Sequence, residues 1–299
     1  MRIIGHRGTP SCSLHPENTL ESIRAALDAG ADGVEIDVRA TRDGVLVLAH
    51  DPDLGRILGA GPQQGPVVAE STLAELRGLR LGNGVRVPTL IEALDLAAAH
   101  HAFVVTEVKP ESGGAAAART ARLLGELLDD RRARHPGADR VSTSSFDLAT
   151  AASLAGHGTV SGALIVAPHV DPEVAARRAL RRGVTDVHLN PAHVRRDPAV
   201  VSRVRGLGLL VAVGVVDDLV EARLVSRLGA DMICTDDPVR LVRGMETWTA
   251  SRCGDGRRLA GVGSPASEMP ILDARRPRSR RTHGSTVPAG AAHLPSPVV

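Results

Sequence analysis

Two carboxylates and a histidine stand in an unusual place in the segment GVEIDVRATRDGVLVLAHD, residues 33–51. Glu35 and Asp37 interrupt an apolar run that is typical of a buried strand, and they share one face of it because they are two residues apart. A second apolar run follows and ends at His50. Carboxylates are costly to bury unless they are paired or bind a metal. The segment therefore predicts a functional site within the core.

A turn between the two runs suggests how the histidine reaches the acids. Asp43-Gly44, flanked by apolar residues, is a strong signal for a two-residue hairpin loop. With a two-residue loop at this position, Asp37 lies directly opposite His50. The hairpin would then bring the imidazole beside the carboxylate pair.

The segment FVVTEVKP carries a second pair of charged residues at the same spacing. Glu107 and Lys109 are two residues apart, and Lys109 is the only lysine in the chain. Lysine offers a compact point charge where arginine offers a planar fork, so a specific role is favoured over a surface one. Three carboxylates at one rim would repel each other unless a cation neutralises them. Hard oxygen ligands of this kind favour Mg2+ or Ca2+.

The first apolar run ends at His6-Arg7 and adds a second imidazole and a second cation. His6 and His50 make an acid–base pair, and Arg7 and Lys109 would supply positive charge to an anionic phosphate. A metal, two histidines and two cations together indicate phosphoryl chemistry.

Short apolar runs alternate with helical patterns along most of the chain. The expected strands are residues 2–5, 33–38, 103–108, 140–145, 162–167, 184–189, 208–215 and 230–235. Eight strands with helices between them predict an α/β fold, a (β/α)8 TIM barrel, in which the carboxyl ends of the strands form the active-site rim. An open doubly wound sheet is the alternative, but no GxGxxG follows a strand.

Two segments stand outside this repeat. Residues 51–88 are rich in glycine and proline and contain a short helical pattern, which predicts a small insertion after the hairpin of the second strand. Residues 250–299 lack periodicity and are rich in Arg, Pro and Gly, which predicts a disordered tail. The expected organisation is a catalytic barrel over 1–249, with 51–88 as an inserted subdomain.

Composition excludes several other classes of protein. The tail contains eight arginines against three acidic residues, so residues 1–249 carry a net charge of about −3 and show no footprint for nucleic acid. Three cysteines without CxxC spacing give neither a disulfide frame nor a zinc site. No apolar run approaches a membrane span, and MRIIGHRG enters a strand without room for a signal peptide. These features predict a cytoplasmic protein; they do not specify its oligomeric state.

The segments GHRGTPSCSLHPENTLESIRAALDAGADGVEIDVRATRDGVLVLAHD, VPTLIEAL, TEVKP and GADMICTDDP resemble those of the glycerophosphodiester phosphodiesterase family. The resemblance covers residues 2–242, and its N-terminal block is the specific part. It implies a TIM barrel with an inserted subdomain and a divalent metal on Glu35, Asp37 and Glu107. It also implies acid–base catalysis by His6 and His50, with Arg7 and Lys109 on the phosphate.

The reaction implied by the resemblance is hydrolysis of small glycerophosphodiesters to glycerol 3-phosphate and an alcohol. In bacterial members the glycerol 2-hydroxyl attacks phosphorus and expels the alcohol, and water then opens the cyclic phosphate. We take His50 as the acid for the leaving group as a hypothesis. Glu17, Asn18 and Asp236 are interpreted as residues that contact substrate or support those that do, although Asn18 in PENT is equally suited to be a helix N-cap.

One departure from the family concerns the seventh strand. Where the family has a sequence like WTVND, this chain has GVVDD, so Gly214 replaces the tryptophan and Asp217 the asparagine. The loss of an aromatic wall leaves the head-group preference open. The alternatives are a related phospholipase D-like or lysophospholipid phosphodiesterase, and a barrel that binds phosphodiesters without turnover.

Overall fold

The computed structural model describes residues 1–254 except 12–13, 62, 110–113, 138–139, 156 and 158–160, and it describes side chains up to residue 249. The predicted tail therefore lies almost entirely outside the described residues, as does Cys12. Helix α10 continues to Gly254, past the predicted boundary at 249.

The strands are β1 (Arg2–His6), β2 (Gly33–Ala40), β3 (Leu46–Leu48), β4 (Phe103–Val108), β5 (Arg140–Ser145), β6 (Ser161–Val166), β7 (Asp186–Leu189), β8 (Leu210–Gly214) and β9 (Met232–Thr235). The helices are α1 (Leu20–Asp28), α2 (Leu73–Gly78), α3 (Leu90–Ala99), α4 (Ala115–Arg134), α5 (Leu148–Ala155), α6 (Pro172–Arg181), α7 (Pro191–Arg196), α8 (Val200–Arg205), α9 (Leu219–Arg227) and α10 (Pro238–Gly254). Two 3-10 turns, Val68–Glu70 and Gly82–Gly84, flank α2.

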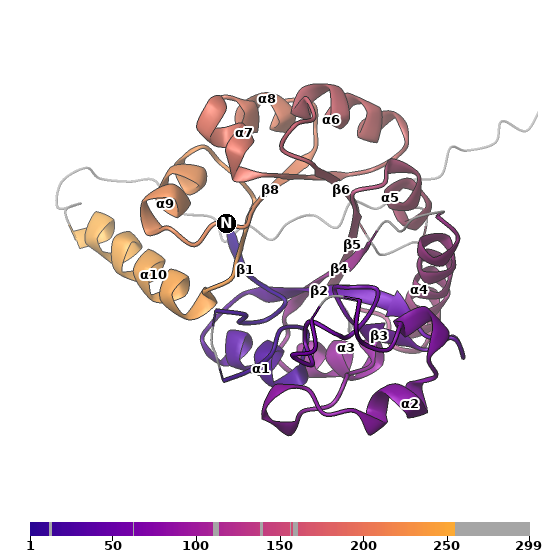
Figure 1. Cartoon of the computed structure of the whole chain (residues 1–299). Coiled ribbons are helices and arrows are strands. Elements are labelled where there is room, and N and C mark those ends of the chain that lie inside the picture. The colour runs from indigo at the N-terminus through magenta and orange to yellow at the C-terminus, as the bar shows by residue number, and fades with distance from the viewer. Residues whose placement is uncertain are drawn as a thin grey trace, which may run out of the picture. The chain divides into compact units, whose positions relative to one another are not determined.

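The strands form a closed parallel barrel, as predicted. Their order is β1-β9-β8-β7-β6-β5-β4-β2, and a further pairing of β1 with β2 closes the ring. Figure 1 looks into this ring and shows the helices surrounding it. Each of the eight expected strands corresponds to one barrel strand, and only β3 lies outside the ring, antiparallel to the end of β2. The (β/α)8 prediction is confirmed.

The core has two layers because the side chains of each strand alternate between two faces. Val34, Ile36 and Val38 of β2 pack outward against the helices. Ile4, Val105, Ala212 and Met232 fill the barrel interior. The residues between the outward-facing ones on β2, Glu35 and Asp37, therefore point into the barrel.

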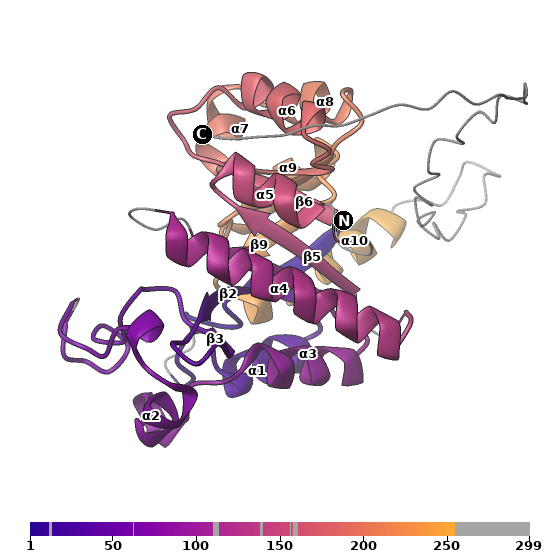
Figure 2. The ribbon, with the colours of Figure 1, turned by 90° about the vertical axis from the view of Figure 1, so that its right-hand side faces the viewer.

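The segment after β3 has a small core of its own. Leu54, Val68, Leu76 and Val87 pack together there against Val47 of β3, and the side view shows this segment with α2 lying beside β2, α1 and α3 (Figure 2). This arrangement agrees with the predicted insertion over residues 51–88, whose limits stay a prediction. No helix in the described part of the chain is long and apolar enough to cross a membrane.

The predicted register of the hairpin was wrong by one residue. The loop has three residues instead of two, because the amide of Thr41 donates to the carbonyl of Val45 at 2.9 Å. Gly44 takes the left-handed φ of 86° that such a loop requires at its last position. Asp37 therefore lies opposite Ala49, whose amide donates to the Asp37 carbonyl at 3.1 Å, and not opposite His50.

Candidate active site

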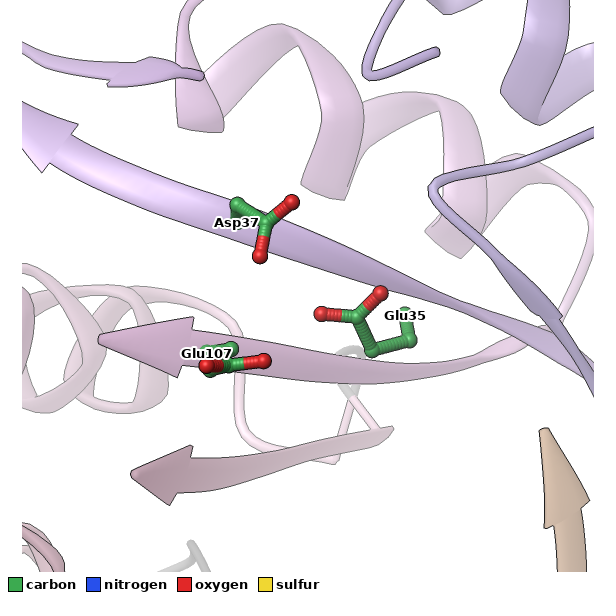
Figure 3. A group of neighbouring side chains, drawn as sticks. All are labelled: Glu35, Asp37 and Glu107. Carbon is green, nitrogen blue, oxygen red and sulfur yellow. The ribbon is translucent and has the colours of Figure 1, made fainter. Parts of the chain in front are cut away.

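Three acidic side chains meet inside the carboxyl end of the barrel (Figure 3). Glu35 and Asp37 come from β2, and Glu107 comes from β4, where it pairs in register with Asp37. Their exposed fractions are 6%, 0% and 5%, and one oxygen from each lies within 4.8 Å of the others. The structure thus brings together the three residues that the sequence predicted as metal ligands.

The electrostatics of this acid cluster are unfavourable without a cation. Burial, followed by the negative charge of Asp37, raises the pKa of Glu35 to about 8. Burial also raises the pKa of Glu107. Burial acts in the same direction on Asp37, but the positive charges of Lys109 and Arg7 outweigh it and hold the Asp37 pKa below its usual value. At neutral pH the cluster therefore retains a proton or needs additional positive charge.

Two cations already contact the acid cluster. The ammonium of Lys109 lies 2.9 Å from Asp37 Oδ1 and 2.7 Å from Glu107 Oε1. The guanidinium of Arg7 lies 3.2 Å from Asp37 Oδ2 and 3.1 Å from Glu17 Oε1. Both predicted phosphate-binding residues thus stand at the edge of the acid cluster, and Glu17 holds Arg7 there.

Asn18 orders Asp37, and the N-cap interpretation of Asn18 was wrong. Its side-chain amide donates to Asp37 Oδ2 at 2.8 Å, and its Oδ1 accepts from the Asp37 amide at 3.1 Å. Thr19 is the residue that caps α1, since its hydroxyl accepts from the Ser22 amide. Asn18 therefore fixes both the backbone and the carboxylate of one cluster residue.

His6 forms a dyad with Asp236. Its Nδ1 lies 2.6 Å from Asp236 Oδ1, and its Nε2 lies 3.8 Å from Glu35 Oε2. Burial lowers the pKa of His6, but the hydrogen bond to Asp236 and the charge of Glu35 outweigh burial and raise it. Asp217 holds Asp236 in turn, because its Oδ1 accepts from the Asp236 amide at 2.8 Å. Nε2 is thus the His6 nitrogen directed at the acid cluster.

His50 forms a second dyad with its neighbour Asp51, at 2.7 Å from Nδ1 to Oδ1. Burial lowers the pKa of His50, and the charge of Lys109 adds to this effect while Asp37 opposes it. Arg56 links Asp51 to Glu17, with ion pairs of 2.6 Å to each. His50, Glu17 and Asn18 line one small cavity together with residues of the insertion. The bend after β3, rather than hairpin pairing, brings His50 to this side of the acid cluster.

Several residues of the site were not predicted. Asp51 and Arg56 complete the His50 network, and Arg39 contacts the carbonyl of His50. Arg39 could have been found, since it is two residues beyond Asp37 and therefore on the same face of β2. Arg56 lies in the irregular insertion, where no periodicity indicates the direction of a side chain.

Gly214, the departure from the family pattern, leaves no room for a side chain. A Cβ atom at this position would lie 2.6 Å from Cβ of Cys234, which is well inside van der Waals contact. The rim at the end of β8 is therefore formed by backbone next to the partly buried Cys234. An aromatic residue could not stand at position 214 with the backbone as it is.

The donor set fits a hard divalent cation. Among the described residues, nothing donates a hydrogen bond to Glu35 Oε1, and only the Lys109 ammonium contacts Asp37 Oδ1 and Glu107 Oε1. Carboxylate oxygens of this kind are the ligands preferred by Mg2+ and Ca2+. The acid cluster can hold a metal ion.

Binding of a divalent cation is expected to lower the pKa of His6. A cation on Glu35 would neutralise one of the charges that raise this pKa, so the pKa should move down towards its ordinary value. NMR titration of the histidine side chains with and without Mg2+ measures the change. His193, whose Nε2 contacts the carbonyl of Val170, serves as internal control. An unchanged His6 pKa with metal bound would contradict the assignment of Glu35 as a ligand.

Comparisons with known proteins agree with this geometry. The family model of the glycerophosphoryl diester phosphodiesterase family matches residues 6–240. A glycerophosphodiester phosphodiesterase of Caldanaerobacter subterraneus subsp. tengcongensis is 30% identical over 251 residues, which cover 80% of this chain and 96% of that protein.

Two solved structures have the same fold. A phosphodiesterase of Oleispira antarctica, in complex with the product sn-glycerol-3-phosphate, is 25% identical with a TM-score of 0.70 and covers 82% of this chain and 97% of its own. A glycerophosphodiester phosphodiesterase of Thermotoga maritima is 24% identical with a TM-score of 0.65 and covers 81% of this chain and 97% of its own. The chain described here belongs to the glycerophosphoryl diester phosphodiesterase family.

Proposed function

We propose that this protein hydrolyses glycerophosphodiesters to glycerol 3-phosphate and an alcohol, with one divalent cation and two histidines. The observation that carries the proposal is the buried acid cluster of Glu35, Asp37 and Glu107, flanked by two His–Asp dyads. Family membership and the product complex of the Oleispira antarctica relative support the substrate class.

Glu35, Asp37 and Glu107 would hold the cation, Mg2+ or Ca2+. When bound, such an ion polarises a phosphoryl oxygen and offsets the charge that develops on it. The surrounding residues prepare its site, because Asn18 fixes the Asp37 carboxylate and β2 and β4 hold the three carboxylates in register.

Arg7 and Lys109 would bind the phosphodiester anion. Lys109 stands 2.9 Å from Asp37, where its ammonium balances negative charge in the absence of a cation. With Asp37 and Glu107 serving as metal ligands, the Lys109 ammonium would be available to contact a phosphate oxygen. Arg7 is held by Glu17 at 3.1 Å, so its guanidinium is already oriented before substrate binds.

The two histidines would move the protons of the reaction. In the first step a new O–P bond forms from the glycerol 2-hydroxyl, whose proton His6 accepts, and the bond to the alcohol breaks as His50 protonates the leaving oxygen. We keep this assignment of roles although the raised pKa of His6 and the lowered pKa of His50 favour the opposite one. In the second step water opens the cyclic phosphate, with the proton transfers reversed. In each dyad the carboxylate engages Nδ1, which leaves Nε2 as the nitrogen for transfer.

A lysophospholipid substrate is the alternative within the same chemistry. Phe146 is 43% exposed, and its ring centre lies 5.9 Å from the Lys109 ammonium. Apolar surface beside a phosphate-binding cation could accept part of an acyl chain. The head group and the acyl chain are therefore both varied in the test of function.

The direct test measures release of glycerol 3-phosphate from glycerophosphocholine and glycerophosphoethanolamine. Protein stripped with a chelator should be inactive, and added Mg2+ or Ca2+ should restore release. Glu126→Gln, at an exposed position on α4 that pairs with Arg122 in the neighbouring turn, should behave as wild type. If no cation restores release although one raises the melting temperature, the substrate class is wrong, and lysophospholipids are assayed next. If no cation binds at all, the metal-dependent proposal fails.

A further inference from the structure

The backbone at His50 is not fixed by the sheet that leads to it. Strand β3 ends at Leu48, and the last bond from the hairpin to β2 runs from the Ala49 amide to the Asp37 carbonyl. His50 follows in a bend of the chain. The position of its imidazole therefore depends on contacts made outside the β ladder.

Arg39 makes such a contact. Its Nε and Nη2 both donate to the carbonyl oxygen of His50, at 3.1 Å and 2.7 Å. Arg39 is only 6% exposed, and it pairs with Val47 on β3. The guanidinium thus reaches from the middle of the hairpin to the residue at which the hairpin pairing has ended.

The free-energy cost of burying the Arg39 guanidinium favours a specific role for this contact. Burial lowers the pKa of Arg39, while the charges of Asp37 and Asp51 oppose that effect, and the guanidinium stays charged. A buried cation is expensive in free energy. A planar fork can direct two N–H groups at one carbonyl oxygen, which a lysine ammonium on a flexible stem does less well.

His50 is held from two sides by these neighbours. Asp51 engages Nδ1 of the imidazole at 2.7 Å, and Arg56 fixes Asp51 at 2.6 Å. Asp51 orients the ring, and Arg39 fixes the main chain that carries it. We infer that Arg39 is a positioning residue for His50: its guanidinium holds the His50 carbonyl where strand pairing no longer does. The kinetic consequences of this inference rest on the proposed function.

Arg39→Met tests the inference because methionine keeps much of the apolar bulk and removes both donors. We expect kcat at saturating metal to fall by about 10- to 100-fold, since small misplacement of a reacting group costs rate on this scale, while KM changes little. Arg39→Lys, with one donor restored, should recover part of the loss.

A matched control exists on the same hairpin. Arg119 donates from Nη1 to the Thr41 carbonyl at 2.6 Å, so it is also a guanidinium bound to the hairpin backbone, but at the turn. Arg119→Met should leave kcat unchanged. An equal loss of kcat in both variants would show general loosening of the hairpin and would overturn the inference.

The double variant with His50→Ala separates positioning from direct contact with substrate. If Arg39 acts through His50, Arg39→Met should cost less than about twofold in the His50→Ala background. A full loss in that background, or a loss that appears mainly in KM, would mean that Arg39 acts on the substrate, and would refute the positioning role.

A spectroscopic measurement tests the inference without turnover. In Arg39→Met the imidazole resonances of His50 should shift or broaden, while those of His193 stay in place. Unchanged His50 resonances would contradict the inference whatever the kinetics show. If the wild-type protein is inactive, the proposed function is contradicted. The NMR measurement then tests the positioning role of Arg39 by itself.

Discussion

Replacing Glu35 by glutamine is expected to reduce metal-dependent hydrolysis strongly and, at the same time, to stabilise the metal-free protein. A Lewis-acid cation contributes several kcal/mol to catalysis, and each ~1.4 kcal/mol is a factor of ten in rate. Loss of one of three charged ligands should therefore reduce activity on the order of 10³-fold. Glutamine keeps the shape of the side chain, so the fold should be retained.

The gain in stability follows from the pKa of Glu35. Its folded-state pKa, raised to about 8 from 4.5, means that the folded state binds this proton more tightly than the unfolded state does. Between pH about 4.5 and about 8, the metal-free protein should lose stability as pH rises, because the unfolded state releases this proton over that range while the folded state keeps it. Glu35→Gln removes this group and should flatten the slope over that range.

Thermal unfolding at several pH values, with and without Mg2+, measures both effects. The wild-type melting temperature should fall as pH rises from 5 to 8 without metal and should recover with Mg2+. Glu35→Gln should melt higher than wild type at pH 8 without metal and should respond weakly to the ion. A variant that melts lower than wild type under those conditions would show that Glu35 stabilises the metal-free fold and would refute the electrostatic interpretation.

Removing either histidine is expected to slow hydrolysis by roughly 10²- to 10⁴-fold, the range of general acid–base catalysis. The two losses should differ in their dependence on the leaving group. If His50 protonates the departing oxygen, a diester with a low-pKa alcohol should lose little in His50→Ala, because that oxygen needs no proton to leave. His6→Ala should remain slow with the same substrate.

Rates for glycerophosphocholine and for a glycerophospho-p-nitrophenyl ester, measured in both variants, decide the assignment. Substitution of a surface histidine, His157→Ala, whose side chain pairs with Asp129, controls for general loss of imidazole. An equal loss in both variants on the activated ester would contradict His50 as the acid. If the activated ester instead restores the rate of His6→Ala, His6 is the acid for the leaving group and His50 is the base.

The barrel and its acid cluster were predictable because both follow from strand periodicity. Glu35 and Asp37 are two residues apart, as are Glu107 and Lys109, and side chains with this spacing must share a face. Parallel strands in a barrel bring their carboxyl ends to one rim. Predicting the position of these four residues did not depend on the conformation of any loop.

The position of His50 could not be derived in the same way. Thr41 closes a three-residue loop through its hydroxyl, which accepts from the Val45 amide at 2.9 Å, and this interaction is not visible in strand alternation. The Asp43-Gly44 pair predicted a turn correctly but gave the wrong loop length. The pairing within the dyads was equally hidden: the family resemblance named Asp236 as a site residue, but its contact with His6, 230 residues away, depends on the closure of the barrel.

That closure also sets the order in which the site can be completed during synthesis. β1 pairs with both β2 and β9, so the chain must reach its last barrel strand before Asp236 can engage His6. Glu35, Asp37 and Glu107 lie on strands that are made early and pair directly. The acid cluster therefore needs none of the later strands, whereas the His6–Asp236 pair needs the last of them. Proton transfer, and with it turnover, would begin only after the barrel has closed.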